Sequence, residues 1–243
     1  MIKYKIGLLL VATGKYIKFV EPLIESVRKY FLLNHNITVY LFTDQPATYF
    51  QQTDRVQIVK YPIPSYKFPF ATLYRYRIFE QFQKEINEDF VFYSDVDMKF
   101  VARVGDEILQ NTLVAVHHPG YFANQGWGSS NNSKDSMSYL PVEKRKNYFA
   151  GGFQGGKRDL YIEAANILNA RIQDDESRGV IAEWNDETHW NWLLNSGEVN
   201  LPYIALTPEY CMVEQMNLRK AWGISHLKPK ILALEKNHEE VRS

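Results

Sequence analysis

The stretch Glu88-Asp89-Phe90-Val91-Phe92-Tyr93-Ser94-Asp95-Val96-Asp97 decides the fold, because it joins a buried strand directly to two carboxylates. Its apolar and aromatic centre is typical of a strand packed on both faces. In open α/β sheets, ligands bind just beyond the carboxyl ends of the strands. In extended geometry Asp95 and Asp97 would point the same way. They therefore predict a site for a divalent cation that also holds phosphates; the alternative is a solvated Asp-x-Asp turn.

Outward from this stretch, strand-like and helical patterns alternate through the first half of the chain. Strands are expected at residues 6–11, 37–43, 56–59 and 90–94, and amphipathic helices at residues 20–31 and 73–86. The second half is less regular, with a strand at 113–116, a long loop at 122–138, and helices at 160–172 and 186–194. The alternation predicts an α/β fold with a mostly parallel, Rossmann-like central sheet and flanking helices. The length of the loop suggests a mobile lid or an acceptor loop.

Composition excludes several classes of protein. The 28 basic residues balance the 28 acidic ones, which argues against a nucleic-acid partner. The apolar run 6–12 is too short to span a bilayer and no cleavage site follows it, so we expect no membrane span and a cytoplasmic location. Cys211 is the only cysteine, which rules out an internal disulfide. We expect it to be a small buried apolar residue.

A second acidic cluster, Glu183-Trp184-Asn185-Asp186-Glu187-Thr188-His189, lies near the other end of the chain. A carboxylate such as Glu187 near an indole can bind a sugar hydroxyl, act as a base or act as a nucleophile. The alternative is structural: Asn185 or Asp186 would cap a helix whose acidic first turn complements the helix dipole.

Other candidate site residues are cationic or aromatic. Arg75 could hold a diphosphate with its guanidinium, or lie on a helix surface. His118 could bond a hydroxyl, or be structural. Lys236 and Arg242 could close over phosphates, or belong to a solvated tail. The glycine-rich run 151–156 permits a close backbone approach that a ligand could use, although it lacks the Lys-Ser/Thr of a P-loop.

Together these motifs resemble the family 6 glycosyltransferases, the ABO blood-group and α-1,3-galactosyltransferase family. The matching stretches follow the family order over nearly the whole chain: Gly7 through Tyr16, Phe42-Thr43-Asp44-Gln45-Pro46-Ala47, Asp95-Val96-Asp97-Met98, His118-Pro119-Gly120, Ala150-Gly151-Gly152-Phe153-Gln154-Gly155-Gly156, Trp184-Asn185-Asp186-Glu187-Thr188-His189, Pro208-Glu209-Tyr210-Cys211 and Lys236-Asn237-His238. The resemblance implies one GT-A catalytic domain over residues 1–243. Its nucleotide-sugar-binding half would cover about residues 1–115, and its acceptor-binding and catalytic half about residues 116–243, with a mobile C-terminal tail.

The resemblance also implies an activity and a set of site residues. The activity is transfer of galactose or N-acetylgalactosamine (GalNAc) from UDP, with retention, in α-1,3 linkage to a glycan acceptor that ends in galactose and is possibly fucosylated. The implied roles are: Asp95 and Asp97 as ligands of Mn²⁺ or another divalent cation such as Mg²⁺, with Asp95 also near the ribose; Ala12, Thr13 and Tyr16 around uracil; Arg75, Asp186, Lys236 and Arg242 on the donor sugar or diphosphate; Glu187 as nucleophile or transition-state stabiliser; and His118 and Trp184 at the acceptor.

The family reads the C2 substituent of the donor sugar at Ala150-Gly151-Gly152. Gly152 leaves room for an acetamido group, which favours UDP-GalNAc, with UDP-galactose as the alternative. Two departures from the family pattern are Asn185, where members often have His, and Met212-Val213, where they have Trp-Asp. That Asp usually touches the acceptor, so the acceptor stays open. We expect a compact form without the membrane anchor and stem of animal members, as in microbial relatives.

Two rival interpretations remain. One is a retaining transferase that uses another donor, such as UDP-glucose. The other is a non-catalytic sugar-binding protein on the same scaffold, against which the three carboxylates of Asp95, Asp97 and Glu187 argue.

Overall fold

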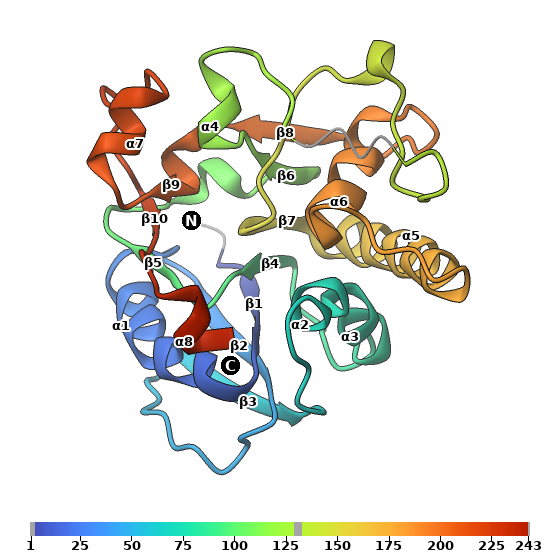
Figure 1. Cartoon of the computed structure of the whole chain (residues 1–243). Coiled ribbons are helices and arrows are strands. Elements are labelled where there is room, and N and C mark those ends of the chain that lie inside the picture. Colours follow the sequence, from blue (N-terminus) through green and yellow to red (C-terminus); the bar gives the residue numbers. More distant parts are fainter. Residues whose placement is uncertain (1–2, 129–132, 243) are drawn as a thin grey trace.

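The computed structural model describes residues 3–128 and 133–242, apart from the side chains of His238 and Arg242. Within these residues the centre is a seven-stranded sheet in the order β3-β2-β1-β4-β7-β6-β8 (Figure 1). Its strands are β1 (Lys5–Ala12), β2 (Asn36–Thr43), β3 (Val56–Pro62), β4 (Phe90–Ser94), β6 (Leu113–Val116), β7 (Phe153–Lys157) and β8 (Tyr203–Leu206). Each strand is parallel to its neighbours except β7, which is antiparallel to both β4 and β6. The predicted mostly parallel α/β sheet is confirmed.

Helices cover both faces of this sheet (Figure 1). α1 (Val20–Tyr30) packs on one face, in the same apolar cluster as Leu8 and Leu10 of β1. α3 (Arg75–Gln81) and α5 (Arg158–Ser177) pack on the other face, in the cluster that contains Leu9. Successive β1 side chains thus enter opposite layers, because side chains alternate along a strand. This explains why the strand is a continuous apolar run.

A smaller sheet lies beside the large one and places a strand near the C-terminus next to the strand that follows Asp97. It pairs β10 (Ile231–Ala233) with β5 (Met98–Phe100) and with β9 (Met212–Val213). The remaining elements are η1 (Gly14–Phe19), α2 (Phe70–Leu73), η2 (Asp106–Ile108), α4 (Pro119–Phe122), η3 (Val142–Lys144), α6 (Asn185–Asn195), η4 (Pro208–Tyr210), α7 (Met216–Ala221) and α8 (His238–Arg242), where η denotes a 3₁₀ helix. The stretch expected as a loop has no helix or strand at residues 123–128 and 133–138, and residues 129–132 lie outside the described part.

The helix expected at residues 73–86 is wrong as one element. The structure divides it into α2 and α3, which meet at Tyr74, and α3 ends at Gln81. Tyr74 has φ −85° and ψ 3°, outside helical geometry. Across this break the Nε of Arg75 donates to the carbonyl of Thr72 at 3.1 Å. Arg75 follows the break and points into the protein. The apolar periodicity of a continuous helix does not predict this direction.

The glycines of β7 serve strand packing rather than a ligand. A Cβ on Gly155 would lie 2.3 Å from the carbonyl oxygen of Val91, and one on Gly156 would lie 2.2 Å from that of Thr112. Both approaches are too short for any side chain, so only glycine lets β7 fit between β4 and β6. The expectation of a ligand contact is therefore wrong for these two positions. It concerns only Gly151 and Gly152, which precede the strand.

Candidate active site

The two carboxylates after β4 lie on a tight turn and not on extended backbone. Residues 95–97 join β4 to β5. The amide of Asp95 donates to the carbonyl of Gly152 at 2.8 Å, and the amide of Leu234 donates to the carbonyl of Asp97 at 2.9 Å. The expected extended geometry is wrong, because the chain passes here from the large sheet into the small one. Both side chains nevertheless line the same two cavities.

The first cavity, of about 240 Å³, lies beyond the end of β1. Thr13 and Tyr16, expected around uracil, line it, whereas Ala12 does not and is fully buried. The Thr13 hydroxyl donates to the carbonyl of Tyr66 at 2.9 Å, and residues 65–68 form another wall. Sequence analysis missed this segment. The signal that could have indicated it is a run of prolines and aromatic residues directly after a strand.

The second cavity, of about 500 Å³, shares Asp95, Asp97 and Lys236 with the first. Its inner end is formed by Ala150, Gly152, Glu187 and His118. Its outer wall comes from β9, α7 and β10, which sequence analysis also missed. Because the shared side chains border both cavities, molecules bound in the two cavities would meet beside them.

Arg75 lies behind the carboxylates and joins them. Its side chain is 2% exposed. One terminal nitrogen, Nη2, lies 3.3 Å from Asp95 Oδ1 and 3.1 Å from Asp186 Oδ2, and Nη1 donates to the carbonyl of Gly151 at 2.9 Å. The guanidinium also stacks over the Tyr93 ring at 4.0 Å. Burial opposes its charge, but the neighbouring acidic groups outweigh burial and raise the pKa of Arg75. The alternative of a surface arginine is wrong, because Arg75 is buried. Arg75 lines neither cavity, so a direct contact with the donor stays a prediction.

The second acidic pair divides at the start of α6. Asp186 is buried against Arg75, and burial raises its pKa to about 7 although the guanidinium opposes the rise. Glu187 turns the other way and lines the second cavity, where its Oε2 accepts from the amide of Gly151 at 2.8 Å. The N-cap residue is Trp184, and not Asn185 or Asp186 as expected. The Trp184 side chain makes no capping hydrogen bond. Asn185 begins α6 with φ +50°.

The two expected acceptor residues are placed differently. His118 lines the second cavity, and its Nδ1 accepts from the amide of Gly120 at 3.1 Å. Burial lowers the pKa of His118, so the imidazole is neutral near pH 7 and carries its proton on Nε2. Trp184 is 54% exposed and lines neither cavity. Its role at the acceptor stays a prediction.

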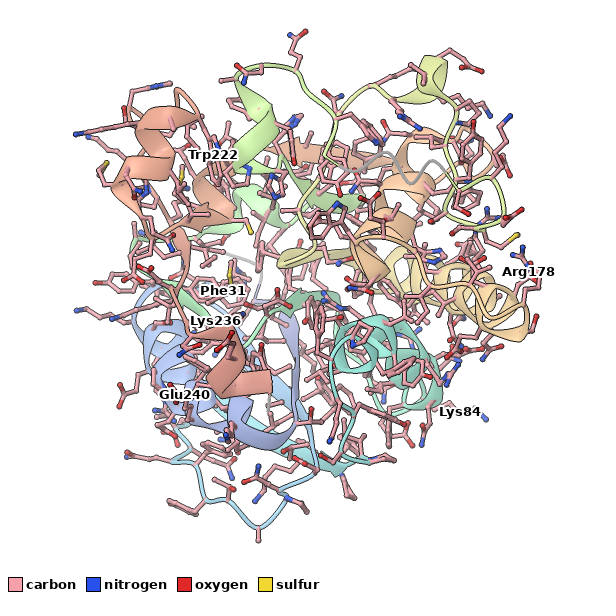
Figure 2. The ribbon with its side chains drawn as sticks, in the orientation of Figure 1. Phe31, Lys84, Arg178, Trp222, Lys236 and Glu240 are labelled. Atoms are coloured by element: carbon pink, nitrogen blue, oxygen red, sulfur yellow. The ribbon has the colours of Figure 1, made fainter. Side chains whose placement is uncertain are left out.

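The C-terminal segment contacts both η1 and the Asp95–Asp97 turn. Lys236 forms an ion pair with the carboxylate of Asp97. Lys18 pairs with Glu240 at 2.8 Å, and Val241 lines the first cavity. Figure 2 shows Lys236 and Glu240 on this segment, beside the N-terminal elements. Arg242 ends α8, but its side chain lies outside the described part, so its role and the mobility of the tail stay predictions.

Gly152 and Cys211 form a close contact beside the turn. A Cβ on Gly152 would lie 3.2 Å from Cys211 Sγ and 3.3 Å from Asp95 Oδ2. Cys211 is buried, as expected, and burial raises the pKa of its thiol, which keeps it protonated. It forms part of the wall of the second cavity.

The architecture and these cavities agree with comparisons to known proteins. A family model described as glycosyltransferase family 6 matches residues 1–243. This chain belongs to glycosyltransferase family 6. The family assignment expected from the motifs is therefore confirmed, and with it the GT-A fold and the activity class of a retaining α-1,3-glycosyltransferase.

Three relatives illustrate the range of the family. The chain is 29% identical to histo-blood group ABO system transferase 1 of Rattus norvegicus over 98% of its own length and 68% of the relative's. It is 27% identical to globoside alpha-1,3-N-acetylgalactosaminyltransferase 1 of Gallus gallus, over 98% and 69%. It is 24% identical to the O-antigen biosynthesis glycosyltransferase WbnI of Escherichia coli, over 77% and 80%. Family membership implies a UDP-sugar donor and a glycan acceptor. Within residues 3–128 and 133–242, no helix is long and apolar enough to cross a bilayer.

Proposed function

We propose that this family 6 enzyme transfers GalNAc from UDP in α-1,3 linkage to a glycan that ends in galactose, with the help of a divalent cation. The observation that supports this most directly is the pair of cavities that share Asp95, Asp97 and Lys236. The nucleotide would occupy the first cavity and the acceptor the second. The anomeric carbon would then lie near the shared residues, within reach of Glu187.

The donor set of the Asp95–Asp97 turn fits a hard cation that is completed by phosphate oxygens. Tyr93 and Arg75 contact Oδ1 of Asp95, and Lys236 pairs with Oδ2 of Asp97. Within the described residues, one oxygen of each carboxylate has no such partner. No described group of three or more His, Cys, Asp or Glu side chains could hold a metal by itself. In this proposal the substrate diphosphate completes the coordination, which is how Mg²⁺ is usually held. When bound, the ion would stabilise negative charge on the leaving diphosphate.

We infer that Glu187 acts on the donor sugar. The hydrogen bond from the Gly151 amide fixes one carboxylate oxygen, and the side chain borders the cavity. In the reaction, the bond from C1 to the UDP oxygen breaks, a bond from C1 to the acceptor O3 forms, and the acceptor proton leaves with UDP. Glu187 would stabilise positive charge at C1, or attack it from the face opposite UDP.

The preference for GalNAc rests on the small residues beside the turn. Ala150 and Gly152 line the second cavity and contribute almost no side-chain volume. Because Cys211 and Asp95 already lie within 3.3 Å of a Cβ on Gly152, a larger side chain would have to extend into the cavity. An acetamido group can occupy that space. A missing acetamido group costs a pocket less than a steric clash does, so UDP-galactose is the expected second donor.

A donor-by-acceptor screen tests the proposal. UDP-GalNAc, UDP-galactose and UDP-glucose are each offered with galactose-terminated glycans, with Mn²⁺ and with a chelator. We expect transfer with UDP-GalNAc and Mn²⁺, weaker transfer with UDP-galactose, and neither in chelator. Equal rates in chelator would refute the metal, and preference for UDP-glucose would refute the donor assignment.

A further inference from the structure

The outer wall of the second cavity is mostly apolar. It is built by β9, the start of α7 and β10, and its side chains include Val213, Leu218 and Leu234. Among the described residues around this cavity, Gln215 contributes the only side-chain amide. An amide both donates and accepts hydrogen bonds, as a sugar hydroxyl does. The wall thus combines one neutral polar group with an apolar surface.

The backbone just before Gln215 is held by several hydrogen bonds. Arg219 is 7% exposed, and its guanidinium donates to the carbonyl of Val213 at 2.7 Å and to that of Glu214 at 3.1 Å. The amide of Glu214 donates to the carbonyl of Ala233 at 3.1 Å, which ties this corner to β10. A side chain on such a corner binds without first ordering the backbone, and this lowers the cost of binding.

The Gln215 amide is available to a ligand. Gln215 precedes α7 as its N-cap residue, but its side chain makes no capping hydrogen bond. Within the described chain, its backbone carbonyl accepts from the amide of Arg219 at 3.2 Å, and its side-chain amide has no protein partner. The side chain is partly buried and faces the cavity. A ligand in the cavity would therefore compete with water for this amide and with no other protein group.

We propose that Gln215 is a specificity-determining residue that binds a hydroxyl of the acceptor sugar, while Val213, Leu218 and Leu234 pack against an apolar face of the same sugar. The inference rests on the proposed function, because it assigns the acceptor to the second cavity. The charges of the described residues around the cavity support a partner without negative charge: Asp95, Asp97, Glu187 and Glu235 are acidic, and the single lysine, Lys236, is already paired with Asp97. A neutral amide adds no further repulsion and needs no counter-charge.

The test compares Gln215→Leu with Asn217→Leu, a control two residues further along, in the first turn of α7, that is exposed and lines neither cavity. Acceptor KM and kcat are measured with a galactose-terminated glycan and with monodeoxy analogues of its terminal sugar. We expect Gln215→Leu to raise the acceptor KM by about three- to tenfold, as for one neutral hydrogen bond. Turnover at saturation should change by less than about twofold, because the contact is uniform binding. UDP-sugar hydrolysis without acceptor should not change.

The deoxy series separates recognition from a structural effect. One monodeoxy acceptor should be weaker for wild type by the same factor, and should show no further loss with Gln215→Leu. The proposal is wrong if each deoxy analogue raises the acceptor KM by the same factor in wild type and in Gln215→Leu. It is also wrong if the acceptor KM of Gln215→Leu matches that of Asn217→Leu. If wild type transfers to no galactose-terminated glycan, the proposed function fails instead. Binding of both proteins to a glycan array with UDP then decides on Gln215, since equal retention of every glycan would overturn its role.

Discussion

The site contains two pairs of carboxylates, and the two pairs are arranged differently. Asp95 and Asp97 lie on a turn, and both line both cavities. Asp186 and Glu187 are adjacent on a helix, where successive side chains diverge by about 100°. One is therefore buried against Arg75 and the other borders the second cavity. Two carboxylates on the turn thus border the same cavities, whereas two adjacent carboxylates on a helix divide between a buried ion pair and a cavity wall.

Removing Arg75 should break both pairs at once and have the largest effect. Arg75→Met leaves Asp186 buried without its ion-pair partner and releases Asp95 and the Gly151 carbonyl. We expect a loss of about 3–5 kcal/mol in the free energy of unfolding, together with loss of activity. Denaturant unfolding measures it. Arg77→Met on the same helix is the control, since that guanidinium pairs with Glu176 away from the cavities and is 34% exposed. Equal losses in the two variants would show that Arg75 does not couple the pairs.

Neutralising the first pair should show that its members act as a unit. Asp95→Asn and Asp97→Asn should each lower metal-dependent turnover by about a thousandfold, as for loss of an electrophilic ion worth several kcal/mol. The double variant should be little worse than either single one, since groups that act together are not additive. Turnover is titrated against Mn²⁺ and against chelator. Full activity of the double variant in chelator would contradict the metal role.

Glu187→Gln should separate the members of the second pair. The amide keeps the size of the side chain, but it cannot stabilise positive charge at C1 or attack it. We expect turnover to fall by at least about a hundredfold, with donor affinity nearly unchanged. A merely helix-stabilising carboxylate would instead cost at most about 1 kcal/mol of stability and little turnover. Thermal unfolding and turnover measured on one preparation decide between the two, and near-normal turnover would place the reactive centre elsewhere.

The contrast between the pairs also marks what a sequence can predict. The strand before Asp95 and the helix at residues 20–30 follow from apolar periodicity, which is a local property. Both acidic clusters are recognised from the sequence pattern itself, and the family motifs then supply the class of activity. The burial of Arg75 could not be predicted, because its partners Gly151 and Asp186 lie far along the chain. A break at Tyr74 that lets a guanidinium turn inward has no periodic signal.

Glycines illustrate the same limit. Gly151, Gly152, Gly155 and Gly156 are equivalent in the sequence, yet the first pair borders the site and the second lies between strands. Only the pairing of β7 with β4 and β6 distinguishes them. The outer wall of the second cavity, which includes Gln215, escaped prediction for a related reason: β9 and β10 are too short to give a strand pattern, and they meet only in the folded chain.

The pH dependence of stability gives the smallest and most selective comparison. Burial raises the folded pKa of Asp186 from 3.8 to about 7. The folded state therefore holds a proton that the unfolded state releases, so this stabilising contribution is complete below about pH 4 and is lost as the pH rises toward 7. Asp186→Asn removes the titration, and the stability of wild type relative to this variant should fall over that window. One group contributes a slope of at most about 1.4 kcal/mol per pH unit.

Urea unfolding of wild type and Asp186→Asn between pH 4 and 8 measures this slope. The matched control is Asp159→Asn, which changes an exposed aspartate on α5. Parallel stability curves for wild type and Asp186→Asn would instead mean that Asp186 stays ionised throughout this range as the counter-ion of Arg75.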